Sequence, residues 1–200
     1  EYALIGVFAS LVGVAEDLAD RGIGRAEEAL GRRFVEPELI RWKSFDGREI
    51  SAEMFESVKA MGITSPLDFQ RRLLAVHAFV AESAAPNLAA ANKRVRNILK
   101  QAGTVSGEVA PQRFAHDAEK ALHARLGELE ALNARTASYR DQLINLAALR
   151  EPVDAFFDGV MVNADDPALR ANRLALLSQL HAAMNRVADL SKLADTAYIK

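Results

Sequence analysis

The sequence predicts an all-α fold, an antiparallel helical bundle, and three observations support this prediction. Ala and Leu together supply 61 of the 200 residues, whereas Gly supplies 11 and Pro 6. Ala and Leu are the best helix formers, and Gly and Pro interrupt helices. Apolar residues recur at spacings of three and four along most of the chain, and no segment shows a convincing alternating strand pattern. The expected helices follow one another closely, and short connections favour antiparallel neighbours.

The first part of the chain, residues 1–64, is predicted to be a lead-in of short helices interrupted by Gly. The apolar segment Tyr2–Ala15 has 14 residues, fewer than the roughly 20 that a membrane span requires. We therefore expect a first helix that is either buried or docked onto another part of a longer protein. The other elements expected here are helices at 25–34 and from about 36, a turn at 44–47, and a helix that Ser51 caps and Gly62 ends.

Residues 65–200 are predicted to form longer and more regular helices. Ser65, Pro66 and Asp68 mark a helix start, because Ser caps the first turn, Pro fits the first position and Asp favours the positive end of the helix. Asp166 and Pro167 mark another start in the same way. The first expected helices run from Pro66 to about Ser83 and from Pro86 to Gly103, and an exposed loop follows at 103–112. A long helix is expected over about 113–136, and its partner begins near Ser138. A separate helix has Pro152 in its first turn and includes Phe157, and the last helix is expected over 167–193.

Apolar side chains at helical spacing give the expected core. Leu67, Leu74, Ala78 and Ala81 share one side of the first long helix. The corresponding stripes of the two other long helices are Leu122, Leu126, Leu129 and Leu132, and Leu169, Leu176 or Leu177, Leu180, Met184, Val187 and Leu190.

Charge and composition exclude several functions. The 25 Lys and Arg and the 27 Asp and Glu give a net charge of −2, which argues against coating nucleic acid through charge alone. No Cys is present, so disulfides and thiolate metal sites are excluded. Gly22 and Gly24 lack the third Gly of a dinucleotide loop, and His116 and His123 do not have the i, i+4 spacing of helical metal ligands. We expect no catalytic residues and no metal site in this segment.

One segment has a local positive charge that the net charge of the whole chain does not reveal. Between Ala84 and Thr104 the chain has no acid but four basic residues. On a helix, three of these would share one side, with Arg94 beside them. Such a cationic side suits RNA phosphates, although it also suits a merely solvated surface. The candidate residues are Lys93, Arg94, Arg96 and Lys100, with Asn92 adding an amide that can donate and accept.

A second candidate group lies at the start of the last helix. Arg170 and Arg173 are one turn apart and follow Asp165 and Asp166. The two arginines could bind phosphates, or they could pair with nearby carboxylates within the fold. The sequence leaves both alternatives open.

Three segments carry a resemblance to a known family. NLAAANKRVRNILK (87–100), LAALREPVDAFFDGVMVNADDPALRANRLALLSQL (146–180) and NRVADLSKL (185–193) resemble the C-terminal region of the β subunit of bacterial glycyl-tRNA synthetases. The stretch from Asp166 to Arg170 is also similar to the Asp-Ala-Leu-Arg pattern that names a wider family of helical anticodon-binding domains. The resemblance runs from about Phe55 to Leu193 and weakens over residues 1–50.

The resemblance implies a division of labour between subunits. Residues 65–200 are expected to be a helical anticodon-binding domain that meets the anticodon arm of glycine tRNA. A separate α subunit is expected to use ATP and Mg and to carry out aminoacylation, in an α2β2 heterotetramer, so no cofactor is expected in this segment. The RNA-binding residues implied are Asn92, Lys93, Arg94, Arg96, Lys100, Arg170 and Arg173.

Two further expectations complete the sequence-based hypothesis. The absence of cysteine and of a targeting signal favours a cytoplasmic location. The alternative function is a helical scaffold that docks subunits of the same synthetase and makes little direct RNA contact.

Overall fold

The computed structural model describes residues 42–43, 49–105 and 107–194. The helices expected before residue 41 and the turn expected at 44–47 lie outside the described residues. The chain divides into two compact units, Glu1–Glu56 and Ser57–Lys200. The predicted division after residue 64 rests on the change from short elements interrupted by Gly to long, regular helices, and it stays a prediction.

In the first unit, a short hairpin leads into a helix. Strand β1 (Trp42–Lys43) pairs antiparallel with β2 (Glu49–Ile50), with Trp42 opposite Ile50. Strands of two residues are too short to show an alternating pattern, which is why the sequence does not reveal them. The hydroxyl of Ser51 then accepts a hydrogen bond of 3.3 Å from the backbone N–H of Met54. Ser51 therefore caps the following helix, as predicted.

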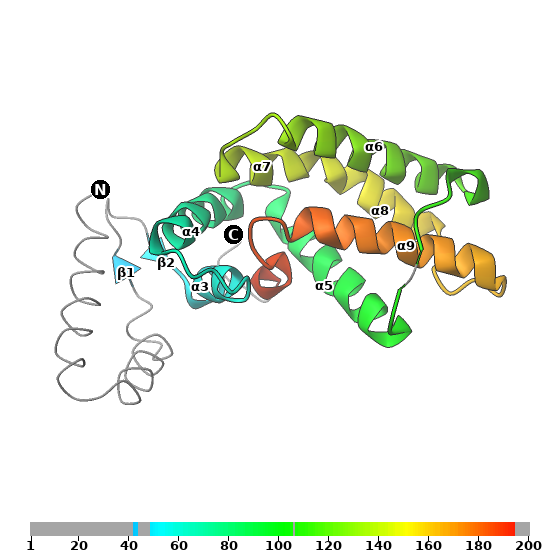
Figure 1. The fold of residues 1–200 in the computed structure, drawn as a ribbon, viewed down its shortest axis with the longest axis horizontal. Helices are drawn as coiled ribbons and strands as arrows, with labels where there is room; N and C mark the ends of the chain where they lie inside the picture. Colours follow the sequence, from blue (N-terminus) through cyan, green and yellow to red (C-terminus); the bar gives the residue numbers. More distant parts are fainter. Residues whose placement is uncertain (1–41, 44–48, 106, 195–200) are drawn as a thin grey trace. The chain divides into compact units, whose positions relative to one another are not determined.

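The second unit is an all-α bundle, which confirms the predicted fold class (Figure 1). Its 3-10 segments η1, η2 and η3 lie between or after the α-helices. The α-helices are α3 (Ala52–Lys59, which begins in the first unit), α4 (Pro66–Val80), α5 (Ala85–Ala102), α6 (Asp117–Asn133), α7 (Tyr139–Asn145), α8 (Arg150–Gly159) and α9 (Pro167–Met184), and the 3-10 segments are η1 (Pro111–Arg113), η2 (Leu146–Leu149) and η3 (Leu190–Leu193).

Helix α9 is the central element of this bundle. It packs against α5 on one side and against α6 on the other, while α6 also packs against α8 and α4 packs against α7 (Figure 1). The side chains between these helices are fully buried, and burying each large apolar side chain contributes about 1.5–3 kcal/mol. The largest of them are Phe79, Leu88, Leu122, Leu143, Leu146, Leu149, Phe156, Leu176, Leu177, Leu180, Met184 and Leu190.

Local signals at the helix ends are confirmed. The Ser65 hydroxyl accepts from the backbone N–H of Asp68 at 3.4 Å. The Asp166 carboxylate accepts from the backbone N–H groups of Ala168 at 2.8 Å and Leu169 at 3.3 Å. Gly103 ends α5 with a φ of +75°, a conformation that few other residues adopt without strain. These interactions involve neighbouring residues only, so the sequence suffices to predict them.

The predicted helix over 167–193 is wrong in its last third. Helix α9 ends at Met184, and the chain turns before η3 begins. The side chain of Asn185 explains the break: its Nδ2 donates to the carbonyl of His181 at 2.7 Å, and its Oδ1 accepts from the N–H of Leu190 at 3.0 Å. One amide thus satisfies backbone groups on both sides of the turn.

Two other expectations about helices need correction. The helix predicted over 113–136 is limited to α6, and the helix predicted from about Ser138 is the short α7, followed by η2. In the predicted stripes, Leu67 is 54% exposed and Leu132 is 50% exposed. The buried side of α4 carries Ala75, Val76 and Phe79 instead. Apolar residues surround most of α4, so their spacing alone does not single out the buried side.

Among the described residues, no single helix has both the length and the hydropathy of a membrane span, although the bent pair Leu67–Val80 and Ala85–Ala102 passes that test jointly.

Candidate nucleic-acid interface

The four basic residues of α5 do not form one stripe. Residues two apart on a helix point to nearly opposite sides, and Arg94 and Arg96 contact different elements. The Arg94 guanidinium lies over the ring of Phe157 in α8, with Cζ 4.1 Å from the ring centroid. This cation–π contact holds an exposed arginine against a half-buried aromatic ring.

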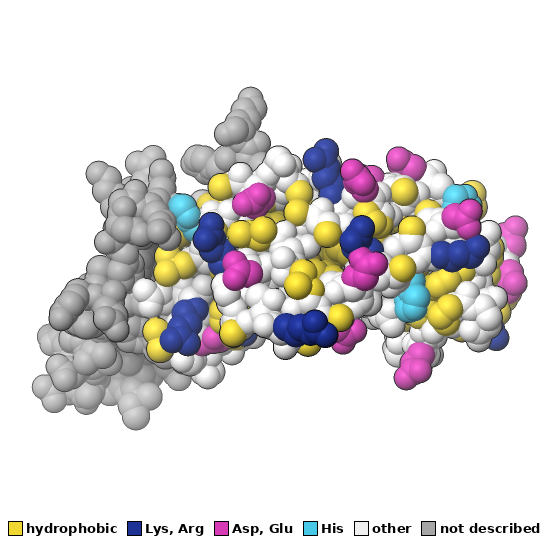
Figure 2. Space-filling view, turned by 90° about the horizontal axis from the view of Figure 1, so that it is seen from above, with side chains coloured by type: hydrophobic (Ala, Val, Ile, Leu, Met, Phe, Trp, Pro, Cys, Tyr) yellow, Lys and Arg dark blue, Asp and Glu magenta, His cyan; other side chains and the backbone are white. Residues whose placement is uncertain are grey.

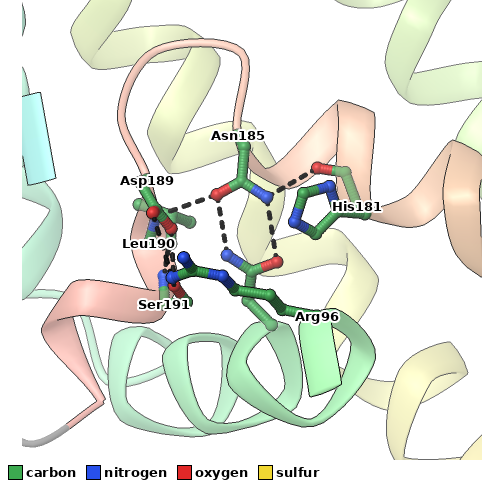
Figure 3. Close-up of polar contacts among 7 residues, drawn as sticks. Arg96, His181, Asn185, Asp189, Leu190 and Ser191 are labelled. Carbon is green, nitrogen blue, oxygen red and sulfur yellow. Dashed lines mark hydrogen bonds and ion pairs between the residues drawn. The ribbon is translucent and has the colours of Figure 1, made fainter. Parts of the chain in front are cut away.

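Arg96 reaches the C-terminal segment of the bundle. Its Nη1 donates to the Ser191 hydroxyl at 2.8 Å and lies 3.4 Å from Oδ2 of Asp189 (Figure 3). Asp189 also caps η3, since its Oδ1 accepts from the backbone N–H of Ser191 at 3.1 Å. The Arg96 side chain is still 50% exposed. Arg96 therefore has a structural role and keeps part of its guanidinium at the surface.

Lys93 and Lys100 lie at exposed positions of α5. Lys100 is in the last turn of the helix, where a positive charge interacts favourably with the helix dipole. Arg170 is exposed in the first turns of α9, and its backbone N–H donates to the carbonyl of Asp166. These three side chains lie where a large ligand can reach them.

Asn92 has an internal role that the sequence does not indicate. Its side chain is fully buried and exchanges two hydrogen bonds with the amide of Asn185, of 2.8 and 3.0 Å. This pair joins α5 to the turn after α9. We therefore leave Asn92 out of the candidate interface, because its amide is satisfied within the fold.

His181 lies beside this polar cluster (Figure 3). Burial lowers its pKa, the nearby Arg96 lowers it further, and Asp189 opposes both effects. The lowered pKa favours the neutral form of His181.

Arg173 is likewise an internal residue. It is 8% exposed, its Nε donates to Oε1 of Glu119 at 3.0 Å, and its Nη1 donates to the carbonyl of Met161 at 2.7 Å. Glu119 is fully buried, and its Oε2 accepts from the backbone N–H groups of Ala115 and His116 at 2.9 and 2.8 Å. The sequence left two alternatives for Arg173, phosphate binding or pairing with a carboxylate, and the structure supports the pairing. We therefore do not include Arg173 in the candidate interface.

A second polar cluster surrounds the side chain of Arg72, and the sequence does not indicate it. Arg72 of α4 donates to Asp68, to the Tyr139 hydroxyl and to the carbonyls of Arg186 and Val187, at 2.8 to 3.1 Å. The hydrogen bond from Arg72 is the main reason that the pKa of Asp68 lies below its usual range, and a hydrogen bond from Tyr139 adds to it. This cluster joins α4, α7 and the turn after α9. The pair with Asp68 has the local i, i+4 spacing. The contacts with Tyr139, Arg186 and Val187 join segments far apart in sequence, so no local pattern could reveal them.

The described part of the face seen in Figure 2 has mixed charge. On the face seen in Figure 2, Lys and Arg side chains lie among Asp and Glu side chains and do not gather into one large patch. The candidate interface therefore consists of a few exposed cations on α5 and at the start of α9: Lys93, Arg94, Arg96, Lys100 and Arg170. Among the described residues, no group of three His, Asp or Glu side chains is placed to hold a metal ion.

The second unit is by its fold a small all-α bundle with exposed cations on α5 and at the start of α9. The chain belongs to the DALR anticodon binding domain family, whose sequence model matches residues 88–193. The match begins within α5 and ends with η3.

Individual relatives extend this comparison. A glycine–tRNA ligase beta subunit from Thiobacillus denitrificans is 59% identical over 128 residues, which are 62% of this chain and 18% of that protein. One from Leptothrix cholodnii is 52% identical over 149 residues, 72% of this chain and 21% of that protein. One from Dechloromonas aromatica is 50% identical over 178 residues, 84% of this chain and 24% of that protein. The chain therefore spans about a fifth of the length of the curated relatives it matches.

Proposed function

We propose that this chain is the part of a glycine–tRNA ligase β subunit that binds the anticodon arm of glycine tRNA and so supports aminoacylation. The observation that carries the proposal is the match of an anticodon binding domain to residues 88–193, which comprise the helices that present the exposed cations. Relatives at 50–59% identity that are named as this subunit support the choice of ligase.

The exposed cations give the proposal a physical basis. Lys93, Lys100 and Arg170 can neutralise backbone phosphates, which positions an RNA without reading its sequence. Arg94 offers more than charge, because its guanidinium already lies over Phe157. Unpaired anticodon bases can stack on arginine planes. Arg94 is therefore the residue of the interface best suited to contact a base.

The proposal assigns the chemistry to another chain. The α subunit of the ligase would use ATP, Mg and glycine, and the complete enzyme would be an α2β2 heterotetramer in the cytoplasm. This chain would contribute RNA binding alone.

The test is a charge reversal on the exposed surface of α5. Arg94→Glu and Lys100→Glu should each weaken the affinity for glycine tRNA about tenfold, as measured by fluorescence anisotropy at fixed salt. Arg96 is less suitable, because reversing its charge would place a carboxylate beside Asp189 and perturb η3. Arg140→Glu is the matched control, since Arg140 is exposed on α7 and lies outside the interface.

Circular dichroism separates binding from folding in this experiment. The proposal is supported if the α5 variants retain the helical spectrum of the wild type, lose affinity, and the control loses none. Unchanged affinity in both α5 variants would contradict the interface and favour a subunit-docking scaffold.

A further inference from the structure

The turn between α9 and η3 is held from several sides, and the proposed function gives it no role so far. The backbone N–H of Asp189 donates to the carbonyl of Ser57 in α3 at 2.8 Å. Nη1 of Arg72 in α4 donates to the carbonyl of Val187 at 2.8 Å. The buried asparagine pair described above ties the start of the turn to α5. The backbone that leads from α9 into η3 is therefore fixed by three other helices.

Arg96 of α5 is an exposed cation that contacts this fixed segment directly (Figure 3). Its Nη1 donates to the hydroxyl of Ser191 at 2.8 Å. The same hydroxyl donates to Oδ1 of Asp189 at 2.6 Å. An ionised carboxylate can only accept and a guanidinium can only donate, so the hydroxyl proton points to Asp189 and an oxygen lone pair faces Arg96. Ser191 is itself buried, and it offers the arginine an acceptor in one defined direction.

The contacts of Arg96 with this segment leave much of its guanidinium accessible. Both of them use Nη1, and the side chain is half exposed. The contact with Asp189 is long, at 3.4 Å, and lies at the surface, where an ion pair neutralises little of the charge. The planar guanidinium has five N–H donors, and two of them on one edge match two oxygens of a phosphate. Arg96 is therefore held at one nitrogen and can still bind an anion.

The neighbours of Arg96 on α5 indicate what that anion is. Lys93 and Lys100 lie one turn before and one turn after Arg96, and all three are exposed on one side of the helix. A lysine carries a point charge on a flexible stem, whereas an arginine carries a rigid fork. Such a row fits the regularly spaced phosphates of a nucleic-acid backbone, and Arg96 is its member with a defined orientation.

We propose that Ser191 is a positioning residue: held by Asp189, it orients the Arg96 guanidinium for contact with one backbone phosphate of the RNA. The inference rests on the proposed RNA-binding function, and it gives the segment after α9 a part in that function. Fixing a long side chain before binding lowers the entropy that binding costs. If the serine only stabilised η3, the effect of its loss on RNA affinity would be the same with or without Arg96.

The first experiment removes the hydroxyl. Ser191→Ala in the full chain should lower the affinity for glycine tRNA about three- to tenfold, which corresponds to ordering one long side chain on binding. Fluorescence anisotropy at several salt concentrations should show an unchanged salt dependence, because no charge is lost. Ser65→Ala is the matched control, since it removes a hydroxyl that caps α4, and it should bind tRNA as the wild type does.

The second experiment asks whether the serine acts through the arginine. Arg96→Gln removes the charge without placing a carboxylate beside Asp189, and should make the plot of log affinity against log salt less steep by about 0.7–0.9. Adding Ser191→Ala to Arg96→Gln should then have no further effect on affinity. Losses that multiply in the double variant would show that Ser191 acts independently of Arg96, and would overturn the proposal.

Arg96→Lys provides a test that does not depend on the folding of Ser191→Ala, because it alters a half-exposed side chain only. It retains the charge and removes the fork, so we expect the salt dependence of the wild type and a weaker affinity. If Arg96→Lys or a folded Ser191→Ala binds tRNA as tightly as the wild type while Lys100→Glu binds more weakly, the positioning proposal is overturned and the proposed function stands. If the wild type itself binds no tRNA, both are overturned.

Discussion

Arg173 and Glu119 form a buried ion pair that joins α9 to the start of α6, with Nε of the arginine 3.0 Å from Oε1 of the carboxylate. The side chains are 9% and 0% exposed. The second carboxylate oxygen accepts from the N–H groups of Ala115 and His116, and Nη1 of the arginine donates to the carbonyl of Met161. An arginine that the sequence allows as an RNA ligand thus fixes three segments of the bundle.

The first prediction concerns this pair. Arg173→Ala leaves the Glu119 carboxylate buried without its counter-charge, and breaking a buried pair in this way costs about 3–5 kcal/mol. Urea unfolding followed by circular dichroism measures the loss. Arg170→Ala is the matched control, one turn earlier and exposed, and should change the free energy of unfolding by less than about 0.5 kcal/mol. Equal stability of the two variants would show that the pair does not support the fold.

The second prediction is a dependence of stability on pH through Asp68. The hydrogen bond from Arg72 and then that from Tyr139 hold the pKa of Asp68 below its usual range. A carboxyl group whose pKa is lowered by folding stabilises the folded state above its unfolded pKa, near 4, and this contribution is lost as the pH falls through the folded pKa. The wild type should therefore lose more stability than Asp68→Asn when the pH falls below about 4. Unfolding free energies over this range provide the comparison, and parallel curves would contradict the assignment.

The third prediction concerns the structural role of Asn92 on α5. Asn92→Ala leaves the amide of Asn185 without its two bonds from the helix, and we expect a loss of about 1–3 kcal/mol in unfolding free energy. Asn97→Ala, at an exposed position of the same helix, should be nearly neutral. Thermal unfolding of both variants checks this difference. A neutral Asn92→Ala would return that residue to the list of candidate RNA contacts.

The fourth prediction concerns salt. If Lys100 neutralises one phosphate, Lys100→Ala should make the plot of log affinity for glycine tRNA against log salt concentration less steep by about 0.7–0.9. The measurement is fluorescence anisotropy at several salt concentrations. Arg140→Ala on α7 should leave the slope unchanged. An unaltered slope in Lys100→Ala would remove this lysine from the interface.

Much of the fold could be predicted because its signals are local. Ser65, Gly103 and Asp166 act on backbone groups within a few residues, and the spacing of Leu122, Leu126 and Leu129 matches one buried side of α6. The end of α9 was missed because Asn185 can cap a helix or continue it, and its bonds to Asn92 and Leu190 decide which.

The candidate site was harder to predict because its chemistry depends on tertiary contacts. Charge and spacing correctly identify a cationic helix, yet they do not distinguish Arg94, which lies over Phe157, from Arg96, which bonds Ser191. The burial of Asn92 also follows from the approach of a distant segment.

Footprinting of glycine tRNA with the full chain tests the central claim, that this domain binds the anticodon arm. Nuclease or hydroxyl-radical cleavage of end-labelled tRNA is measured with the wild type and with Arg94→Glu. If the domain binds the anticodon arm, the wild type protects that arm and the variant protects it less at the same concentration. Protection confined to the acceptor arm, or the same protection with both proteins, would contradict it.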